Sequence, residues 1–170
     1  DPDIDLDKKV YHSEMSHISR NRAIAYLLES KGYIEKNKDV ENSLHFYVKM
    51  CSLSVTAESL AGLGLILAND GIHPDTGKRL LSSQTVKIVK TLMFTCGMYD
   101  GSGEFAVRVG IPSKSGVGGG ILSVVDGEMG IGIFGPALDK KGNSVAGECV
   151  LEYMSHELHL HMFDPQRHTL

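Results

Sequence analysis

The spacing of apolar residues changes near residue 99, and this change constrains the fold more than any other feature of the sequence. Before it, apolar residues recur every three or four positions between capping residues and glycines, which is typical of amphipathic helices. After it, short segments alternate or are continuously apolar, as strands do. We therefore expect an α/β (α+β) protein with a mainly helical part, residues 1–98, and a second part, residues 99–170, of three antiparallel strands and a terminal helix.

Four helices are expected in the first part, each after a residue whose side chain can cap the first turn. The expected caps are Ser19, Asp39, Thr56, and Ser82 or Ser83. Along the second helix, one apolar face is formed by Val40, Leu44, Tyr47, Val48 and Cys51. The glycines inside the third helix, Gly62 and Gly64, indicate close packing against a neighbour.

Three strands are expected in the second part, at residues 103–110, 121–125 and 129–135, with a tight turn at Asp126-Gly127. Asn143 or Ser144 then caps a last helix. One stripe of that helix carries Cys149, Val150, Tyr153, Met154 and Leu158. Three strands make a thin sheet with an open edge, so the sheet is expected to be incomplete in this chain.

Composition excludes several functional classes. The net charge is −4 with no basic cluster, which argues against a nucleic-acid partner. The longest apolar run, residues 61–68, is too short to span a membrane, and no signal-peptide pattern opens the chain as given. The three cysteines are widely spaced, so we expect reduced, mostly buried thiols and a cytoplasmic protein. The first residues lack an initiator Met, which processing, a cloned fragment or trimming would each explain.

Two motifs are considered and set aside. HELHLH at residues 156–161 lacks the i, i+4 histidine pair of a helical zinc site, because position 160 is Leu. Its histidines are expected to be surface residues, so no metal is expected. GVGGG at residues 116–120 lacks the spacing of a phosphate-binding loop, and no cofactor is expected.

Serine chemistry is indicated by Lys114-Ser115-Gly116, within GIPSKSGVGGGI at residues 110–121. A K-[ST]-G triplet opening a strand is typical of serine hydrolases whose nucleophile lies in S-x-x-K. In such sites backbone N–H groups of that strand edge hold the oxyanion, and glycines let substrate approach the backbone. No lysine of this chain has a serine three residues before it, so the nucleophile motif is missing. A loop with a β-bulge is the alternative interpretation of the stretch.

Four separated blocks in the right order resemble the serine-dependent glutaminases, which are β-lactamase-like hydrolases. The resemblance runs from about residue 10 to residue 163 and includes residues 138–147. The blocks are SEMSHISRNRAIAY (13–26), FYVKMCSLSVTAESLAGLGLILANDG (46–71), TLMFTCGMYDGSGEF (91–105) and PSKSGVGGGILSVV (112–125). The resemblance implies conversion of L-glutamine to L-glutamate and ammonia.

The resemblance also implies five site residues. Glu14 would bind the substrate's α-ammonium group, and Asn21 would hydrogen-bond its amino-acid end. Tyr47 would orient the serine–lysine pair, and Tyr99 would contact the nucleophile and shuttle a proton toward the leaving ammonia. The Val117 N–H would form half of the oxyanion hole. Lys114 would shape the local charge without a catalytic role.

Taken singly, these residues have ordinary structural interpretations. Glu14 alone would be a solvated residue at a helix entry, and Asn21 a polar residue of a first turn. Tyr47 would belong to a core and Tyr99 would anchor a loop. Only their joint occurrence at the family's spacing favours the functional interpretation.

The missing S-x-x-K segment implies that this chain is the C-terminal part of a glutaminase. The N-terminal half would supply the nucleophile and the missing strands, and the relatives assemble as dimers or tetramers. Two alternatives stay open: an inactive relative that binds glutamine-like ligands or a partner, and a β-lactamase-type or peptidase-type amidohydrolase. Glu14 distinguishes the second alternative, because a β-lactam needs no ammonium-binding carboxylate.

Overall fold

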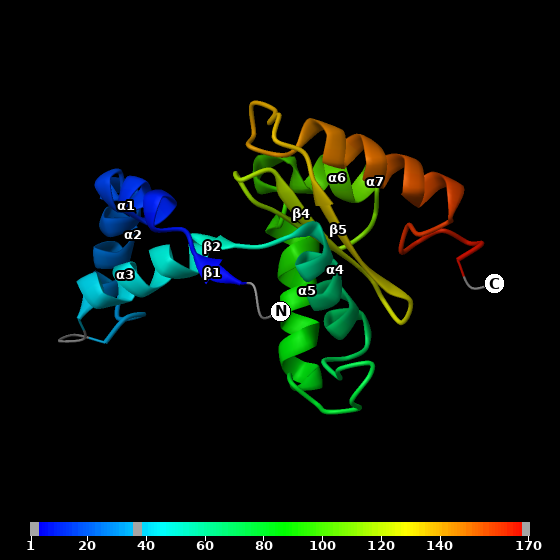
Figure 1. The fold of residues 1–170 in the computed structure, drawn as a ribbon, viewed down its shortest axis with the longest axis horizontal. Coiled ribbons are helices and arrows are strands. Elements are labelled where there is room, and N and C mark those ends of the chain that lie inside the picture. The colour runs from blue at the N-terminus through cyan, green and yellow to red at the C-terminus, as the bar shows by residue number, and fades with distance from the viewer. Residues whose placement is uncertain (1–3, 36–38, 168–170) are drawn as a thin grey trace. The chain divides into compact units, whose positions relative to one another are not determined.

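The computed structural model describes residues 4–35 and 39–167. The chain forms two compact units, which divide between Val55 and Thr56 and are described one at a time (Figure 1). The boundary expected between residues 98 and 99 was placed where the sequence changes from helical to strand spacing, and it differs from this division. The two divisions differ because the helices between Thr56 and Gly97 pack on the sheet of the second unit.

The first unit is built from three helices: α1 (Lys8–Ser16), α2 (Ser19–Ser30) and α3 (Val40–Cys51). Two short strands, β1 (Asp5–Leu6) and β2 (Leu53–Ser54), pair antiparallel. The Asp39 side chain accepts a hydrogen bond from the Asn42 N–H, so the expected cap of α3 is confirmed. For α2 the expected cap is wrong, because the capping position is Ile18 and Ser19 is the first helical residue. Helix α1 was not expected from the sequence.

The core of the first unit contains four buried apolar residues: Ile18, Val40, Leu44 and Val48. Of the five residues expected on one face of α3, Tyr47 and Cys51 are exposed instead. Val40, Leu44 and Val48 follow an i, i+4, i+8 spacing that forms a narrower stripe. Tyr47 therefore does not belong to the core.

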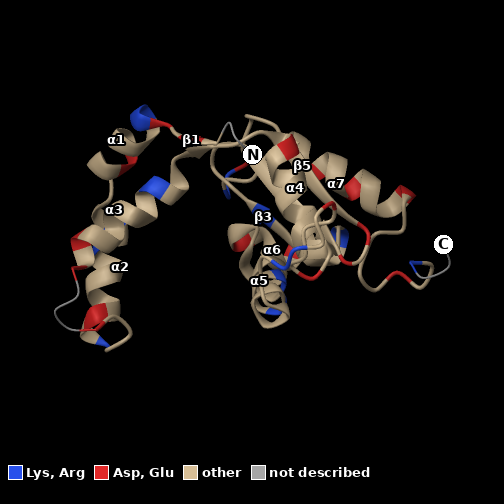
Figure 2. Cartoon of the chain, turned by 60° about the horizontal axis from the view of Figure 1, so that its bottom comes forward, with Lys and Arg blue, Asp and Glu red and all other residues tan. Residues whose placement is uncertain are grey.

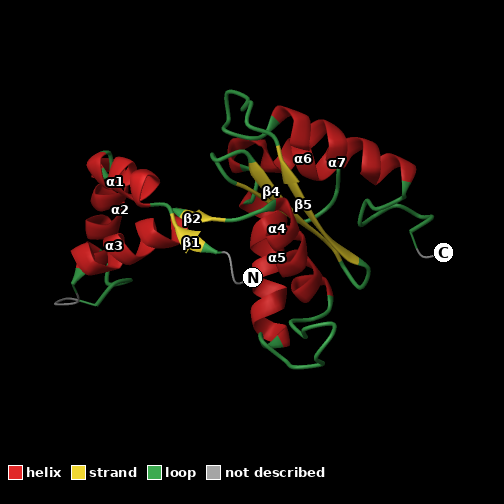
Figure 3. Ribbon diagram, in the orientation of Figure 1, coloured by secondary structure: helices red, strands yellow, loops and turns green. Residues whose placement is uncertain are grey.

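The second unit contains a three-stranded antiparallel sheet in the order β3 (Ser113–Ser115), β4 (Gly120–Val125) and β5 (Met129–Phe134) (Figure 3). Its helices are α4 (Ala57–Ala68), α5 (Ser83–Cys96), α6 (Ser102–Arg108) and α7 (Val145–Glu157). The expected caps Thr56, Ser82 and Ser144 each accept a first-turn N–H and are confirmed. The chain is thus a mixed α/β protein with small antiparallel sheets.

Helices cover both faces of this sheet, and β4 is therefore buried on both sides. Leu122 and Val124 point to one face and pack in a cluster with residues of α4 and α5. Ile121 and Val125 point to the other face and pack in a cluster with residues of α6 and α7. Neighbouring residues of β4 therefore point to opposite faces of the sheet and belong to different cores.

The backbone of α4 lies directly against β5, and glycines make this possible. A Cβ at Gly132 would lie 1.9 Å from the Ala57 carbonyl oxygen, and one at Gly130 would lie 2.2 Å from the Ala61 carbonyl oxygen. From the helix side, a Cβ at Gly64 would lie 2.8 Å from the Gly130 Cα. The close packing expected of Gly64 is confirmed. Gly62 has no such neighbour among the described residues, so that expectation is wrong.

Residues 103–110 do not form the expected strand; they lie in and just after α6. Phe105 and Val109 are buried four residues apart, whereas Val107 between them is 79% exposed. The alternation in the sequence is therefore accidental, and the burial follows the helical period. The third strand is instead β3, Ser113–Ser115, which contains the Lys114 and Ser115 of the K-S-G stretch.

Two expectations about α7 and the cysteines are also wrong. The residues of α7 that are buried are Gly147, Leu151 and Ser155, whereas Val150 and Tyr153 are exposed. All three cysteines are free and exposed, not buried.

Figure 2 shows basic residues dispersed over several elements of both units. Within residues 4–35 and 39–167, no helix combines the length and the apolar character that crossing a membrane requires.

Candidate active site

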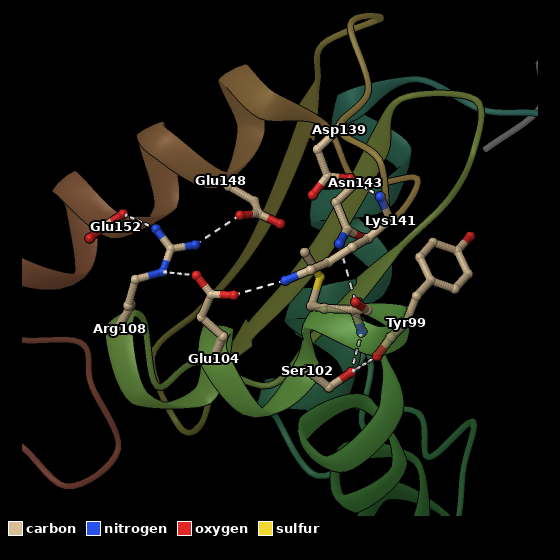
Figure 4. A network of polar contacts seen from close by, with 10 residues as sticks. Tyr99, Ser102, Glu104, Arg108, Asp139, Lys141, Asn143, Glu148 and Glu152 are labelled. Carbon is tan, nitrogen blue, oxygen red and sulfur yellow. Dashed lines mark hydrogen bonds and ion pairs between the residues drawn. The ribbon is translucent and has the colours of Figure 1, made fainter.

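Tyr99 lies at the end of α5, where the chain turns through a single turn of 3-10 helix, Tyr99–Gly101. Its φ is 51°, in the left-handed region that a tyrosine rarely adopts. The residue is 38% exposed, and Figure 4 shows its ring pointing away from Ser102 and α6. The Lys114 Nζ lies 4.6 Å from the centroid of this ring. A cation–π contact of this kind contributes about 0.5–1 kcal/mol at an exposed site.

The alternation of β3 directs Lys114 away from its two serine neighbours. Ser113 and Ser115 are both buried. The Ser113 and Ser123 hydroxyls lie 2.7 Å apart across the β3–β4 pair. Lys114 is paired with Leu122, faces the opposite side of the sheet and contacts the Ser115 carbonyl through Nζ. The lysine of the K-S-G stretch therefore lies with Tyr99, and its serine lies in the core.

Residues 116–119 form a tight turn between β3 and β4, and not a bulge within a strand. The Gly116 N–H donates to the Gly120 carbonyl and the Gly119 N–H donates to the Gly116 carbonyl, both at 2.9 Å. Val117 at the tip is 65% exposed, and its N–H donates no hydrogen bond to any of the residues that the structure describes. Gly119 has φ 94°, and a Cβ there would lie 2.6 Å from the Gly135 carbonyl oxygen. The turn therefore needs a glycine at this position.

A second turn, residues 139–143, lies against both Tyr99 and Val117. A Cβ at Gly142 would lie 3.5 Å from the Val117 Cγ1 and 3.6 Å from the Tyr99 Cε2, which is ordinary van der Waals contact. The Asp139 carboxylate shapes this turn, because its Oδ1 accepts hydrogen bonds from the N–H groups of Lys141 and Asn143 (Figure 4). These N–H groups, that of Asn143 first, lower the pKa of Asp139. The structure thus brings Tyr99, Lys114 and Val117 to one corner of the second unit.

The other three expected site residues lie in the first unit. Glu14 is on α1, Asn21 on α2 and Tyr47 on α3. Neither Glu14 nor Asn21 makes a side-chain hydrogen bond or ion pair with any residue in 4–35 or 39–167. Tyr47 is 52% exposed. All three side chains are thus accessible within their own unit, and their convergence with Tyr99 and Val117 stays a prediction.

Sequence reasoning missed the residues that hold Tyr99 in place. Ser102 and Asn143 are buried and hydrogen-bond the backbone at Met98 and Tyr99. No local pattern predicts the Asn143 contact, because Asn143 and Met98 are 45 positions apart. The Ser102 contacts span only three and four positions, but Ser102 lies in no helix or turn expected from the sequence. The nearest signal is the block at residues 138–147, which the resemblance included without giving it a role.

The histidines near the C-terminus surround a different hollow. A cavity of about 410 Å³ is lined by Arg108, Glu152, His156, His159 and His161, among others. Another, of about 520 Å³, is lined by residues of α5 and by Asp126. Neither is lined by Tyr99 or Val117. Within the part of the chain that the structure describes, no three His, Cys, Asp or Glu side chains are grouped so that they could hold a metal ion.

Comparison with known proteins decides the family. The model of the glutaminase family matches residues 1–163. The chain belongs to the glutaminase family. It is 56% identical over 160 residues to a glutaminase of Clostridium tetani, and 56% identical over 163 residues to one of Fusobacterium nucleatum. These matches cover 94% and 96% of this chain but only 52% and 53% of the relatives. The chain therefore spans about half the length of the curated relatives it matches.

Solved glutaminase structures agree with this assignment. A Bacillus glutaminase crystallised in 4.3 M NaCl is 42% identical, with a TM-score of 0.88 over 94% of this chain and 54% of the other. A Bacillus subtilis glutaminase in covalent complex with 5-oxo-L-norleucine is 42% identical, with a TM-score of 0.89 over 94% of this chain and 57% of the other. The resemblance seen in the sequence is confirmed, and the chain shares the β-lactamase-like fold of these enzymes.

Proposed function

We propose that this chain forms the substrate-binding and oxyanion part of an enzyme that hydrolyses L-glutamine to L-glutamate and ammonia. The observation that carries the proposal is the corner at which Tyr99 and the Val117 turn meet the 139–143 turn, in a chain of the glutaminase family. The Val117 N–H donates to none of the described residues, which supports an oxyanion role, since such a donor must be left for the substrate.

In the proposed reaction, a serine oxygen from the N-terminal half of the enzyme attacks the side-chain amide carbon of glutamine. Charge moves to the amide oxygen, which accepts a hydrogen bond from the Val117 N–H. The lysine of the S-x-x-K pair accepts the serine proton, and a proton passes through Tyr99 to the amide nitrogen, so that the C–N bond breaks and ammonia leaves. Water then hydrolyses the serine ester, which releases glutamate and restores the serine.

The first unit would recognise the amino-acid end of the substrate. A zwitterion needs a carboxylate for its ammonium group and neutral donors for its own carboxylate, and Glu14 and Asn21 supply these types. A charge-assisted hydrogen bond to the ammonium would contribute about 1.5–3 kcal/mol. Tyr47, which is exposed, would lie beside the serine–lysine pair and orient it. The complex of the Bacillus subtilis relative with 5-oxo-L-norleucine supports a ligand of this size.

The proposal includes further parts of the enzyme. The N-terminal half would carry the S-x-x-K nucleophile and base and would add strands to the sheet of β3, β4 and β5. The enzyme would be a cytoplasmic homodimer or homotetramer.

A hybrid protein tests this function. The N-terminal half of the Clostridium tetani glutaminase, fused ahead of this chain, is expected to release ammonia from L-glutamine, whereas this chain alone is expected to release none. Tyr99→Phe in the hybrid should lower kcat about 100-fold, because the proton shuttle is lost. Glu14→Gln should raise KM for glutamine, because the ammonium loses its charged partner.

Three outcomes would contradict the proposal. Turnover by this chain alone would show that it contains a nucleophile. A folded hybrid that binds glutamine without hydrolysing it would favour the inactive binding module. Hydrolysis of β-lactams or peptides, unaffected by Glu14→Gln, would favour the other amidohydrolases.

A further inference from the structure

The left-handed backbone of Tyr99 requires an explanation. Three described residues other than glycine have a positive φ: Asp70, Tyr99 and His159. Aspartate and histidine are tolerated in this region more readily than a tyrosine is. A bulky residue remains there only when its surroundings impose the conformation, at a cost of about 1–3 kcal/mol.

Two side chains fix the peptide groups on either side of the Tyr99 Cα. The Asn143 Nδ2 donates to the Met98 carbonyl at 3.1 Å, and this carbonyl belongs to the peptide group before Tyr99. The Ser102 Oγ donates to the Tyr99 carbonyl at 2.8 Å, and this carbonyl belongs to the peptide group after it. The same Oγ accepts a hydrogen bond from the Met98 N–H at 3.0 Å. Because φ and ψ are the rotations of these two peptide groups, the pair of contacts sets both angles.

Asn143 is well placed to hold its carbonyl partner. Its side chain is completely buried, and among the residues that the structure describes its amide makes this one hydrogen bond. The amide orientation is determined, since only the nitrogen can donate to a carbonyl. The Gly101 N–H also donates to the Met98 carbonyl, at 3.0 Å, but it belongs to the same short turn as Tyr99. Asn143 is therefore the contact that holds this turn from a distant segment.

Asn143 is held in turn by the segment that lies against the phenol. Its own N–H donates to the Asp139 Oδ1 at 2.8 Å, and its carbonyl accepts from the Asp139 N–H at 2.8 Å. The Lys141 Nζ donates to the Glu104 Oε2 at 2.8 Å, which ties the turn to α6 (Figure 4). Gly142 lies between these residues, against the Tyr99 ring. One turn thus sets both the backbone and the ring surroundings of Tyr99.

We propose that Asn143 is a positioning residue for the reaction: it fixes the Met98–Tyr99 peptide group and so aims the Tyr99 phenol at the reacting amide. The inference rests on the proposed function. Asn143 is buried and is not expected to touch substrate, so it acts through Tyr99. Catalysis is sensitive to such aim, because a misplacement of about 1 Å costs about 100-fold in rate.

The test uses the hybrid protein and the variant Asn143→Ala. The kcat for glutamine is expected to fall at least about 10-fold, whereas KM stays within about two-fold, because Glu14 and Asn21 still bind the amino-acid end. The rate is expressed per active site, counted by mass spectrometry as protein labelled to completion with 6-diazo-5-oxo-L-norleucine. A purely structural role would lower the labelled fraction but leave the rate per labelled site unchanged, and this result would overturn the proposal.

A double-mutant cycle tests the route of the effect. In a Tyr99→Phe background, Asn143→Ala is expected to lower kcat by less than about two-fold, because the hydroxyl that it aims is already absent. An undiminished effect in that background would overturn the proposal. The matched control is Asn69→Ala, which removes an asparagine that donates to the Ile72 carbonyl elsewhere in the same unit. It is expected to change neither kcat nor KM.

A crystal structure of the hybrid with Asn143→Ala gives a result that does not depend on activity. The backbone of Tyr99 is expected to leave the left-handed region, and an unchanged φ would overturn the inference. If the unmutated hybrid has no turnover, the proposed function fails, and this structure still decides the role of Asn143. If Asn143→Ala does not fold, Ser102→Ala, which releases the peptide group after Tyr99, is measured in the same ways with the same expected results.

Discussion

The unit that ends at Val55 and the unit that begins at Thr56 are stabilised in different ways. The first has a core of four buried apolar residues, and neither α1 nor α2 contains a buried residue. The second has a sheet with a core on each face and a helix backbone against β5. Because burial is the main stabilising contribution, we expect the first unit to open more easily. The proposed recognition residues Glu14 and Asn21 thus lie in the unit that is expected to open more easily, and Tyr99 lies in the more stable unit.

The largest effect is expected from Gly132→Ala in the second unit. The new Cβ would lie 1.9 Å from the Ala57 carbonyl oxygen, and neither backbone can move without disrupting the sheet. The free energy of unfolding should fall by more than about 3 kcal/mol, measured by urea denaturation. The control is Gly62→Ala in α4, which has open space and should stabilise the helix by up to about 1 kcal/mol. Equal stabilities of the two variants would show that α4 does not lie against β5.

Core truncations compare the two units directly. Leu44→Ala and Leu151→Ala should each cost about 2–5 kcal/mol, because each removes a buried side chain. Hydrogen exchange of the hybrid protein should show faster exchange in α1–α3 alone for Leu44→Ala, and in the second unit for Leu151→Ala. The exposed Leu63→Ala is the control and should change stability by less than about 0.5 kcal/mol. Faster exchange throughout the protein in both variants would mean that the units unfold together.

Removing helix caps should have a smaller effect. Asp39→Ala and Ser82→Ala each remove a side chain that accepts a first-turn N–H, from α3 and α5 respectively. Each should cost about 1 kcal/mol in urea denaturation. Asp39→Ala should also accelerate exchange in α1 and α2, since α3 carries three of the four core residues of that unit. If exchange became faster only in the first turn of α3, the core of the first unit would instead be stable without this cap.

The smallest effect is expected from one surface ion pair in each unit. Hydrogen bonds from Arg22 and from Lys141 lower the pKa of Glu41 and of Glu104 below the ordinary value of 4.5. A lowered carboxyl pKa stabilises the folded state above that value, and this contribution disappears as the pH falls through the lowered pKa. Arg22→Met and Lys141→Met should therefore be slightly destabilising at about pH 7, and this penalty should shrink as the pH falls below the ordinary carboxyl value and vanish below the lowered pKa. A penalty that persists in acid would indicate that the side chains act by packing.

The starts of α3, α4, α5 and α7 were predictable because a helix cap depends on local chemistry, whereas the expected cap of α2 was wrong. Asp39, Thr56 and Ser82 accept first-turn N–H groups as their sequence context indicated. The failure at residues 103–110 has a physical cause as well. Phe105, Val107 and Val109 alternate, and nothing local shows that Val107 faces solvent. Only the packing of Phe105 and Val109 against the sheet selects the helix.

The candidate site was predictable only in its chemically distinctive residues. The K-S-G stretch and its glycines indicated a strand edge near Val117, and the structure has a strand and a turn there. The role of Asn143 could not be identified, because it depends on a contact with the backbone of a segment 45 positions away. Ser102 contacts residues only three and four positions before it, but no sequence pattern indicated that Tyr99 adopts a left-handed backbone that these contacts hold. The spacing of Glu14 and Asn21 carries meaning only through the family resemblance, since each is an ordinary polar residue on a helix.

The glycines between α4 and β5 have a consequence for recombining this chain with its relatives. Gly64 lies some 66 positions before Gly130, yet each occupies space that a side chain at the other would need. A crossover that inherits residues 57–68 from one parent and residues 129–134 from another will give a viable protein only if both parents keep these positions free of side chains. In gene shuffling, residues 57–68 and residues 129–134 should therefore be taken from the same parent.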